Sequence, residues 1–131
     1  MGLFDKAFKS QRDISKKDIE EFHWNALTEE EQLEQIEEES TQKTVVIFKH
    51  STRCGISRMV LRNFEKDFQK QGDEHKMYYL DLIANRNISN QIAKRFNVAH
   101  ESPQVIVIKN GDVAHHASHH SIDAAKVESY I

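Results

Sequence analysis

The cysteine at position 54 is the side chain most suited to covalent chemistry in this sequence. The 131 residues contain one cysteine and one proline, Pro103. A cysteine thiolate is a nucleophile that attacks disulfide sulfurs. A single cysteine excludes a disulfide within the chain, a dithiol redox centre closed within the chain, and a four-cysteine zinc site. Any disulfide of Cys54 must therefore join it to another molecule.

The neighbours of Cys54 favour a reactive thiol over a buried, inert one. Cys54 lies between a predicted buried strand, residues 44–49, and a helix that follows it. Unpaired N–H groups and the dipole at a helix N-terminus stabilise a thiolate. Arg53 and Arg58 add positive charge, and Ser57 is spaced so that its hydroxyl can donate to the sulfur across the first turn. We therefore expect a partly exposed, nucleophilic Cys54.

Two other kinds of residue could contribute to a site. Pro103 precedes a predicted strand, so it is either an ordinary strand-start proline or a part of the Cys54 site. His50 lies four residues before Cys54 and could tune the thiol or bond locally.

The tract 115–120 contains four histidines and resembles a metal-binding tract. Adjacent side chains of a strand point to opposite faces, so these histidines do not converge, and we predict no metal site.

Hydrophobic periodicity assigns the elements that must position these residues. Thr28 and Glu31 are spaced as a capping box at the start of an acidic helix. From Ile56 onward, apolar residues recur at helical spacing, and Ile56 and Met59 belong to the apolar face of the predicted helix. Asn110-Gly111 predicts a hairpin turn. The predicted strands are 44–49, 77–82, 105–108 and 112–119, and the predicted helices are 29–38, 56–71, 88–96 and 122–131.

The order of these elements predicts an α/β fold. Strand–helix–strand units require parallel pairs with right-handed crossovers, whereas the last two strands form an antiparallel hairpin. The expected architecture is a four-stranded mixed sheet flanked by helices, with an extra N-terminal helix, which is the thioredoxin arrangement. We expect one such domain over residues 22–131 and a partly disordered N-terminal tail over residues 1–21.

Charge and hydropathy restrict the partners. The net charge of −3 conceals a −6 segment, residues 1–44, and a +3 segment, residues 45–131. The overall charge argues against a nucleic-acid partner, while the basic segment suits a small anionic ligand. The sequence lacks an apolar run of membrane-spanning length and an export signal, so we expect no membrane partner and a cytoplasmic, reducing location.

Three strings together resemble the YtxJ-type bacillithiol-system proteins, also called monothiol bacilliredoxins. They are F-K-H-S-T-R-C-G-I-S at 48–57, S-P-Q at 102–104 and H-A-S-H at 116–119, and the resemblance extends over about residues 22–131. It implies a thioredoxin-like fold, and bacteria that use bacillithiol in place of glutathione. It also implies removal of bacillithiol from mixed disulfides on oxidised proteins.

The resemblance further implies a role for each residue of the site. Cys54 would be the attacking thiol, Ser57 would replace a resolving cysteine, and Pro103 would be a cis-proline. In redox folds of this type the residue before that proline, here Ser102, offers its backbone to the substrate. Gly55 stands where some members carry proline or serine.

Arg53, Gly55, Arg58, Ser102 and His50 are the expected substrate-binding residues. The expected partners are S-bacillithiolated client proteins and bacillithiol itself, which acts as a thiol co-substrate. We expect no tightly bound cofactor and a monomer.

Two alternatives stay open from the sequence. C-G-I-S differs by one residue from the C-G-F-S of monothiol glutaredoxins, which bridge a [2Fe–2S] cluster between two chains. The glycine pair that follows the last strands in those proteins is absent here. The second alternative is a thioredoxin-like binding module without catalytic activity.

Overall fold

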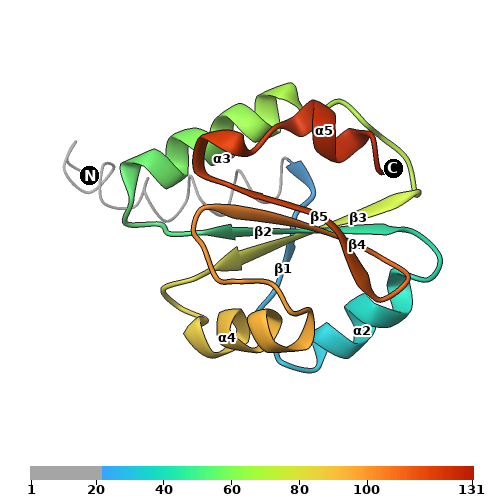
Figure 1. The fold of residues 1–131 in the computed structure, drawn as a ribbon. Helices are drawn as coiled ribbons and strands as arrows, with labels where there is room; N and C mark the ends of the chain where they lie inside the picture. The colour runs from blue at the N-terminus through green and yellow to red at the C-terminus, as the bar shows by residue number, and fades with distance from the viewer. Residues whose placement is uncertain (1–21) are drawn as a thin grey trace, which may run out of the picture.

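A five-stranded mixed sheet forms the centre of the computed structural model, which describes residues 22–131 (Figure 1). The predicted N-terminal tail, residues 1–21, lies outside the described residues. The strands are β1 (Asn25–Ala26), β2 (Thr44–His50), β3 (His75–Asp81), β4 (Gln104–Lys109) and β5 (Asp112–Ser118), in the order β1-β3-β2-β4-β5. β3 runs parallel to β1 and β2, whereas β4 runs antiparallel to β2 and β5.

The mixed sheet confirms the predicted fold class, but the expected count of four strands was wrong. The additional strand, β1, has two residues, too few to show a period-two pattern. It pairs with β3, and the Asn25 side chain donates to the Met77 carbonyl at 3.1 Å. Tertiary pairing rather than local sequence therefore makes this strand.

Helices cover both faces of the sheet. α3 (Gly55–Asp67) and α5 (Ala124–Glu128) lie on one face, and α2 (Gln32–Glu39) and α4 (Arg86–Arg95) lie on the other (Figure 1). A short 3₁₀ helix, η1 (His119–Ser121), connects β5 to α5 and contacts α3. α2 is the predicted extra helix. No helix among residues 22–131 is long and apolar enough to cross a membrane.

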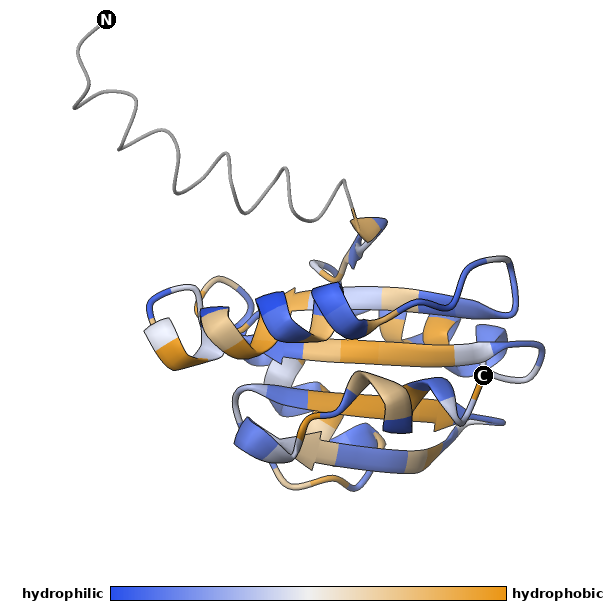
Figure 2. Cartoon of the chain, turned by 90° about the horizontal axis from the view of Figure 1, so that it is seen from above, coloured by the Kyte–Doolittle hydropathy of each residue, from blue (hydrophilic) through white to orange (hydrophobic). Residues whose placement is uncertain are grey.

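The central strand β2 is buried along its whole length. Its side chains alternate between two core clusters because strand side chains alternate between faces. Val46 and Phe48 pack with the α3 side, and Val45 and Ile47 pack with the α2 and α4 side. In Figure 2, which is seen from above, the central strands are largely apolar and the helices in front of them carry more polar residues. Burial on both faces explains the nearly continuous apolar sequence of β2.

The start of α2 differs from the predicted capping box. The helix begins at Gln32, and the Glu31 side chain makes no capping hydrogen bond. Instead the Gln32 side-chain oxygen accepts the N–H groups of Thr28 and Glu29 at 2.8 and 2.9 Å. Gln32 thus binds the Thr28 N–H that the predicted box assigned to Glu31, from one residue later in the chain, and it also binds the Glu29 N–H.

The end of α2 is joined to the β4–β5 hairpin. Asn110 donates its N–H to the Ser40 carbonyl at 2.7 Å, and Gly111 donates to the Ser40 hydroxyl at 2.8 Å. Both turn residues have positive φ, 51° and 79°, as the predicted two-residue hairpin requires. The hairpin prediction is confirmed, and Ser40 anchors its tip.

The first turn of α3 exposes two residues that the sequence placed on its apolar face. Ile56 and Met59 are each 52% exposed, whereas Val60, Phe64 and Phe68 are buried. The buried residue of this turn is Ser57, which is 0% exposed. Apolar periodicity cannot identify a polar residue on the inward face of a helix. The apolar face predicted for α3 was therefore misplaced by one residue in the first turn.

Candidate active site around Cys54

Cys54 is exposed and forms the N-cap of α3. Its backbone is extended, and its N–H donates to the Ser51 carbonyl at 3.1 Å. Its own carbonyl accepts the Arg58 N–H at 3.1 Å, which begins the helix. The thiol therefore lies at the positive end of a 13-residue helix, where a thiolate is stabilised. The expected exposure of Cys54 is confirmed.

The hydroxyl of Ser57 faces away from the predicted partner. It lies 2.7 Å from His50 Nδ1 and accepts the Ser51 N–H at 3.1 Å. Within the described residues no hydrogen bond joins it to the sulfur of Cys54. Ser57 points into the protein because it occupies the inward position of the first helical turn. It ties the start of α3 to the end of β2 and to the loop that carries Cys54.

His50 is buried beneath this loop with 2% of its surface exposed. Its pKa is lowered to about 4, chiefly by burial and slightly by Arg58, against the opposing effects of the Asp81 carboxylate and the hydrogen bond to Ser57. The imidazole is therefore neutral at pH 7 and supplies no positive charge to a thiolate. The hydrogen bond between His50 Nδ1 and the Ser57 hydroxyl links the buried ring to the first turn of α3. His50 thus positions Ser57.

Pro103 directly precedes β4, whose first residue, Gln104, pairs with Lys49 near the end of β2. The His119 N–H donates to the Pro103 carbonyl at 3.0 Å. The Ser102–Pro103 peptide is cis, which confirms the expected cis-proline. The Ser102 hydroxyl is buried without a hydrogen-bond partner among the described residues.

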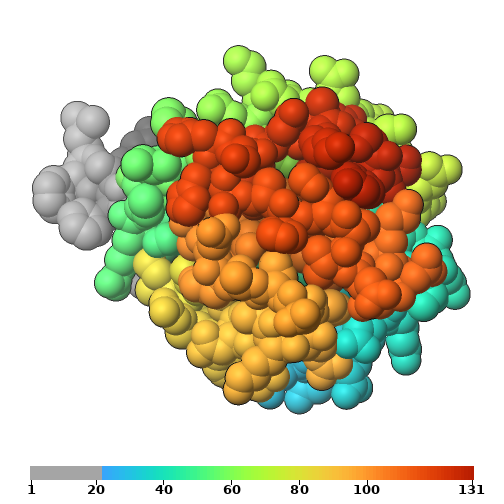
Figure 3. Space-filling view, viewed as in Figure 1, coloured from blue at the N-terminus to red at the C-terminus, as the bar shows by residue number. Residues whose placement is uncertain are grey.

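The remaining predicted residues lie on the surface near the sulfur. Arg53, Gly55 and Arg58 are all exposed and flank Cys54 in the chain. A Cβ added to Gly55 would meet no atom within 4 Å, so the space beside this backbone is open. In Figure 3 the green start of α3 meets the orange-red segment after β5 on one side of the molecule. The site is an open surface.

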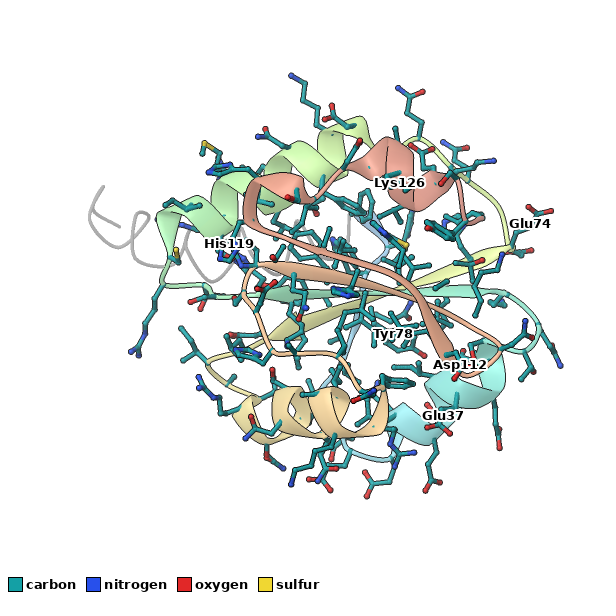
Figure 4. All side chains as sticks on the ribbon, in the orientation of Figure 1. Glu37, Glu74, Tyr78, Asp112, His119 and Lys126 are labelled. Carbon is teal, nitrogen blue, oxygen red and sulfur yellow. The ribbon has the colours of Figure 1, made fainter. Side chains whose placement is uncertain are left out.

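The histidine tract divides between two environments. His115 stacks on the Tyr130 ring with centroids 5.3 Å apart. His119 follows β5 and lies at the end of the sheet where α3 begins (Figure 4). No group of three or more histidine, cysteine or carboxylate side chains among residues 22–131 is placed to hold a metal ion.

A pocket of about 900 Å³ lies away from Cys54. It is formed by the end of α3, the loop after it and the start of β3, and its lining includes Phe22, Phe68, His75 and Met77. Neither Cys54 nor Pro103 lines it. The candidate chemistry is therefore on the surface and not in this pocket.

Sequence reasoning missed a buried polar group behind the site. Lys49, on β2, is 1% exposed, and it bonds to Gln104 and His100 from the loop that carries Pro103. The one signal in the sequence was a lysine directly after the apolar run Val45–Phe48. Such a position is expected to be buried only if the ammonium group has partners.

Comparison with known proteins places the chain in a family. The sequence profile of the monothiol bacilliredoxin BrxC matches residues 25–127, which is most of the chain. The chain belongs to the monothiol bacilliredoxin family. Family membership and the fold together support a thiol redox role for the chain.

Solved structures agree on the fold of this bacilliredoxin. A chain described as a proposed oxidoreductase with a thioredoxin fold is 33% identical, with a TM-score of 0.68; the match covers 80% of this chain and 90% of that one. The thioredoxin of Malassezia sympodialis is 22% identical, with a TM-score of 0.62 and coverages of 81% and 85%. Fasciola hepatica thioredoxin is 18% identical, with a TM-score of 0.60 and coverages of 82% and 99%. The latter two show the fold alone.

Proposed function

We propose that this bacilliredoxin removes bacillithiol from S-bacillithiolated proteins through a mixed disulfide on Cys54. The observation that carries the proposal is the single exposed thiol at the N-terminus of α3, in a chain of the monothiol bacilliredoxin family. The residue one turn later is Ser57 rather than a second cysteine, so the thiol cannot be released by an intramolecular partner.

In the first step the Cys54 thiolate attacks the bacillithiol sulfur of the client's mixed disulfide. The new S–S bond joins Cys54 to bacillithiol, the old S–S bond breaks, and the client sulfur leaves as a thiolate that takes a proton from water. No electron leaves the reacting pair, because one disulfide replaces another. The client is thereby reduced, and Cys54 carries the bacillithiol.

In the second step a free bacillithiol thiolate attacks the bacillithiol sulfur held by Cys54. This attack releases the Cys54 thiolate and gives bacillithiol disulfide, which a separate reductase must reduce. Bacillithiol is thus a co-substrate, and the proposal requires no tightly bound cofactor. A chain that relies on an external thiol also needs a reducing compartment, which is why we place it in the cytoplasm.

The surface around Cys54 is compatible with an anionic ligand and a protein client. Bacillithiol carries malate and cysteine carboxylates, and Arg53 and Arg58 are exposed beside the sulfur. We propose that these arginines attract the carboxylates. We also propose that the client chain lies along Ser102 and that the protein acts as a monomer, because an open site needs no second copy.

Mass spectrometry on a mixture with a purified bacillithiolated protein tests this function. We expect the wild-type chain to gain the mass of bacillithiol on Cys54 while the client loses it, and we expect Cys54→Ser to leave the client modified. Arg62→Gln, which removes a positive charge further along α3, serves as a control for folding and charge. Full activity of Cys54→Ser would falsify the proposal.

Purification without oxygen separates this function from the cluster-carrier alternative. A [2Fe–2S] protein is coloured and absorbs visible light. Under the proposed function we expect a colourless protein. A brown wild-type protein whose colour disappears in Cys54→Ser would favour the cluster carrier instead. Slow and non-selective alkylation of Cys54 would favour the non-catalytic module.

A further inference from the structure

Lys49 holds a buried ammonium group on the face of β2 opposite to His50. It is 1% exposed, and its Nζ donates to His100 Nδ1 at 2.7 Å and to Gln104 Oε1 at 3.1 Å. The ion pairs found among residues 22–131 join other residues, Lys76 with Glu39 and Arg95 with Glu37. Burying a charge costs free energy unless its hydrogen-bond donors are satisfied. The buried Lys49 is therefore expected to have a specific role.

The first partner, Gln104, directly follows Pro103. Its side-chain oxygen accepts from Lys49 and also from the Glu101 N–H at 3.3 Å. Its side-chain nitrogen donates to the Ala99 carbonyl at 3.0 Å. One buried amide thus connects both ends of the loop 99–104. Because an ammonium group only donates, Lys49 fixes which end of this amide faces it.

The second partner, His100, is an exposed residue that covers the ammonium group from the loop side. Its Nδ1 also lies 3.1 Å from the buried hydroxyl of Ser89 on α4. Since Lys49 donates to Nδ1, that nitrogen must carry a lone pair, and the ring is neutral with its proton on Nε2. The loop is therefore attached to β2 and to α4 through one ring nitrogen.

The charges around Lys49 leave it protonated at neutral pH. The pKa of Lys49 is lowered to about 8, chiefly by burial and also by Arg86 at the start of α4, while Glu101 opposes the shift. His100 has its own pKa lowered by burial and by the neighbouring Lys49 and Arg86. At pH 7 Lys49 is thus an ammonium group and His100 a neutral ring, as the hydrogen bond between them requires.

We infer that Lys49 is a positioning residue for client binding. Acting through Gln104 and His100, it holds the loop 99–104, with Ser102 and Pro103, against the end of β2 that leads into the Cys54 loop. This inference rests on the proposed function, in which the client lies along Ser102. Lys49 faces α4, whereas Cys54 begins α3 on the other face of the sheet. Loss of the ammonium group should therefore weaken client binding without changing the intrinsic reactivity of the thiol.

Lys49→Met separates these two effects, because methionine retains the apolar stem and removes the ammonium group. We expect its KM for a bacillithiolated protein to rise roughly fivefold or more, with kcat and the rate of Cys54 alkylation by iodoacetamide within about twofold of wild type. Lys94→Met, an exposed lysine in the last turn of α4, is the matched control and should change none of these values. An unchanged KM in a folded Lys49→Met protein would overturn the inference.

His100→Ala provides a second variant if Lys49→Met does not fold. His100 is exposed, so its removal should not prevent folding, and we expect a KM increase of roughly twofold to fivefold with an unchanged alkylation rate. A higher KM that comes together with slower alkylation of Cys54 and a lower thermal stability would indicate a merely structural role and would overturn the inference. Failure of the proposed function looks different, because the wild-type protein itself would then show no turnover of the bacillithiolated client.

Discussion

At the scale of single residues, the hydrogen bond between His50 and Ser57 shows how the Cys54 loop is held. The pair is buried, with 2.7 Å between His50 Nδ1 and Ser57 Oγ, and the Ser51 N–H completes it at 3.1 Å. A serine in this position therefore does more than replace a resolving cysteine. It fixes the distance between the end of β2 and the first turn of α3.

The buried His50 makes the stability of the protein depend on pH. The unfolded imidazole has a pKa near 6.5, while the folded one has a pKa of about 4. Between these values the unfolded chain binds a proton that the folded chain does not, so stability falls as the pH falls from 6.5 to 4. We expect this loss to reach roughly 3 kcal/mol, from about 1.4 kcal/mol per pKa unit.

Urea unfolding of wild type and His50→Asn at pH 7 and pH 4.5 measures this contribution. The carboxylates titrate in both proteins, so the difference between the two proteins isolates the histidine. We expect wild type to lose more stability on acidification than His50→Asn. Equal losses in the two proteins would show that protonation of His50 is not coupled to unfolding.

Residue types and the family strings predicted an exposed Cys54 and a cis-proline at Pro103, but not the direction in which the neighbours of Cys54 point. The side chain of Ser57 was expected on the sulfur and instead bonds to His50. The partner of the Ser57 hydroxyl depends on which face of α3 is buried, and the packing of the helix on the sheet decides which face that is.

At the scale of secondary structure elements, Gly55 shows that a glycine can stand where no turn requires one. It is the first residue of α3, and its Cβ position is free of contacts within 4 Å. Glycine in a helix costs up to about 0.5–1 kcal/mol relative to alanine, because the unfolded chain loses more freedom. We therefore expect Gly55→Ala to stabilise the protein by up to that amount.

Gly111→Ala is the matched control for this prediction. The space around Gly111 is equally open, but its φ of +79° lies in the region that side chains with a Cβ disfavour. We expect Gly111→Ala to be destabilising in the same chemical denaturation experiment. If Gly55→Ala also lowered stability, the added Cβ would have to disturb the Cys54 loop in a way that its contacts do not indicate.

Periodicity identified the long elements because each carries enough residues to show a pattern. The apolar run of β2, the Asn110-Gly111 hairpin and the existence of the two helices flanking β3 were predicted correctly, although α3 ends at Asp67, four residues before the predicted end. β1 was missed because two residues show no period. The start of α2 was misplaced because four consecutive polar residues, 29–32, offer several capping arrangements, and tertiary structure selects the one with Gln32.

At the scale of the whole molecule, one exposed thiol makes every disulfide intermolecular. We expect the oxidant diamide, added to the concentrated protein, to produce a covalent dimer of about twice the 15.3 kDa chain mass on a non-reducing gel. Cys54→Ser should remain monomeric under the same conditions. In reductant, light scattering should report one chain for both proteins.

The dependence on concentration distinguishes this dimer from other oxidation products. A bond between two copies should form more slowly when the protein is diluted. Wild-type protein that fails to dimerise at high concentration would show that the surroundings of the sulfur exclude a second copy, in spite of its exposure.

Ser40 has a consequence for the synthesis of the chain. Its carbonyl and hydroxyl bind the tip of a hairpin that lies 71 residues later in the sequence at Gly111. On the ribosome, α2 therefore emerges long before Asn110 and Gly111, whose N–H groups bind Ser40 at the C-terminal end of this helix. Contacts of such sequence separation form late and slow the folding of the whole chain. The C-terminal end of this acidic helix is thus completed only after Gly111 has been translated.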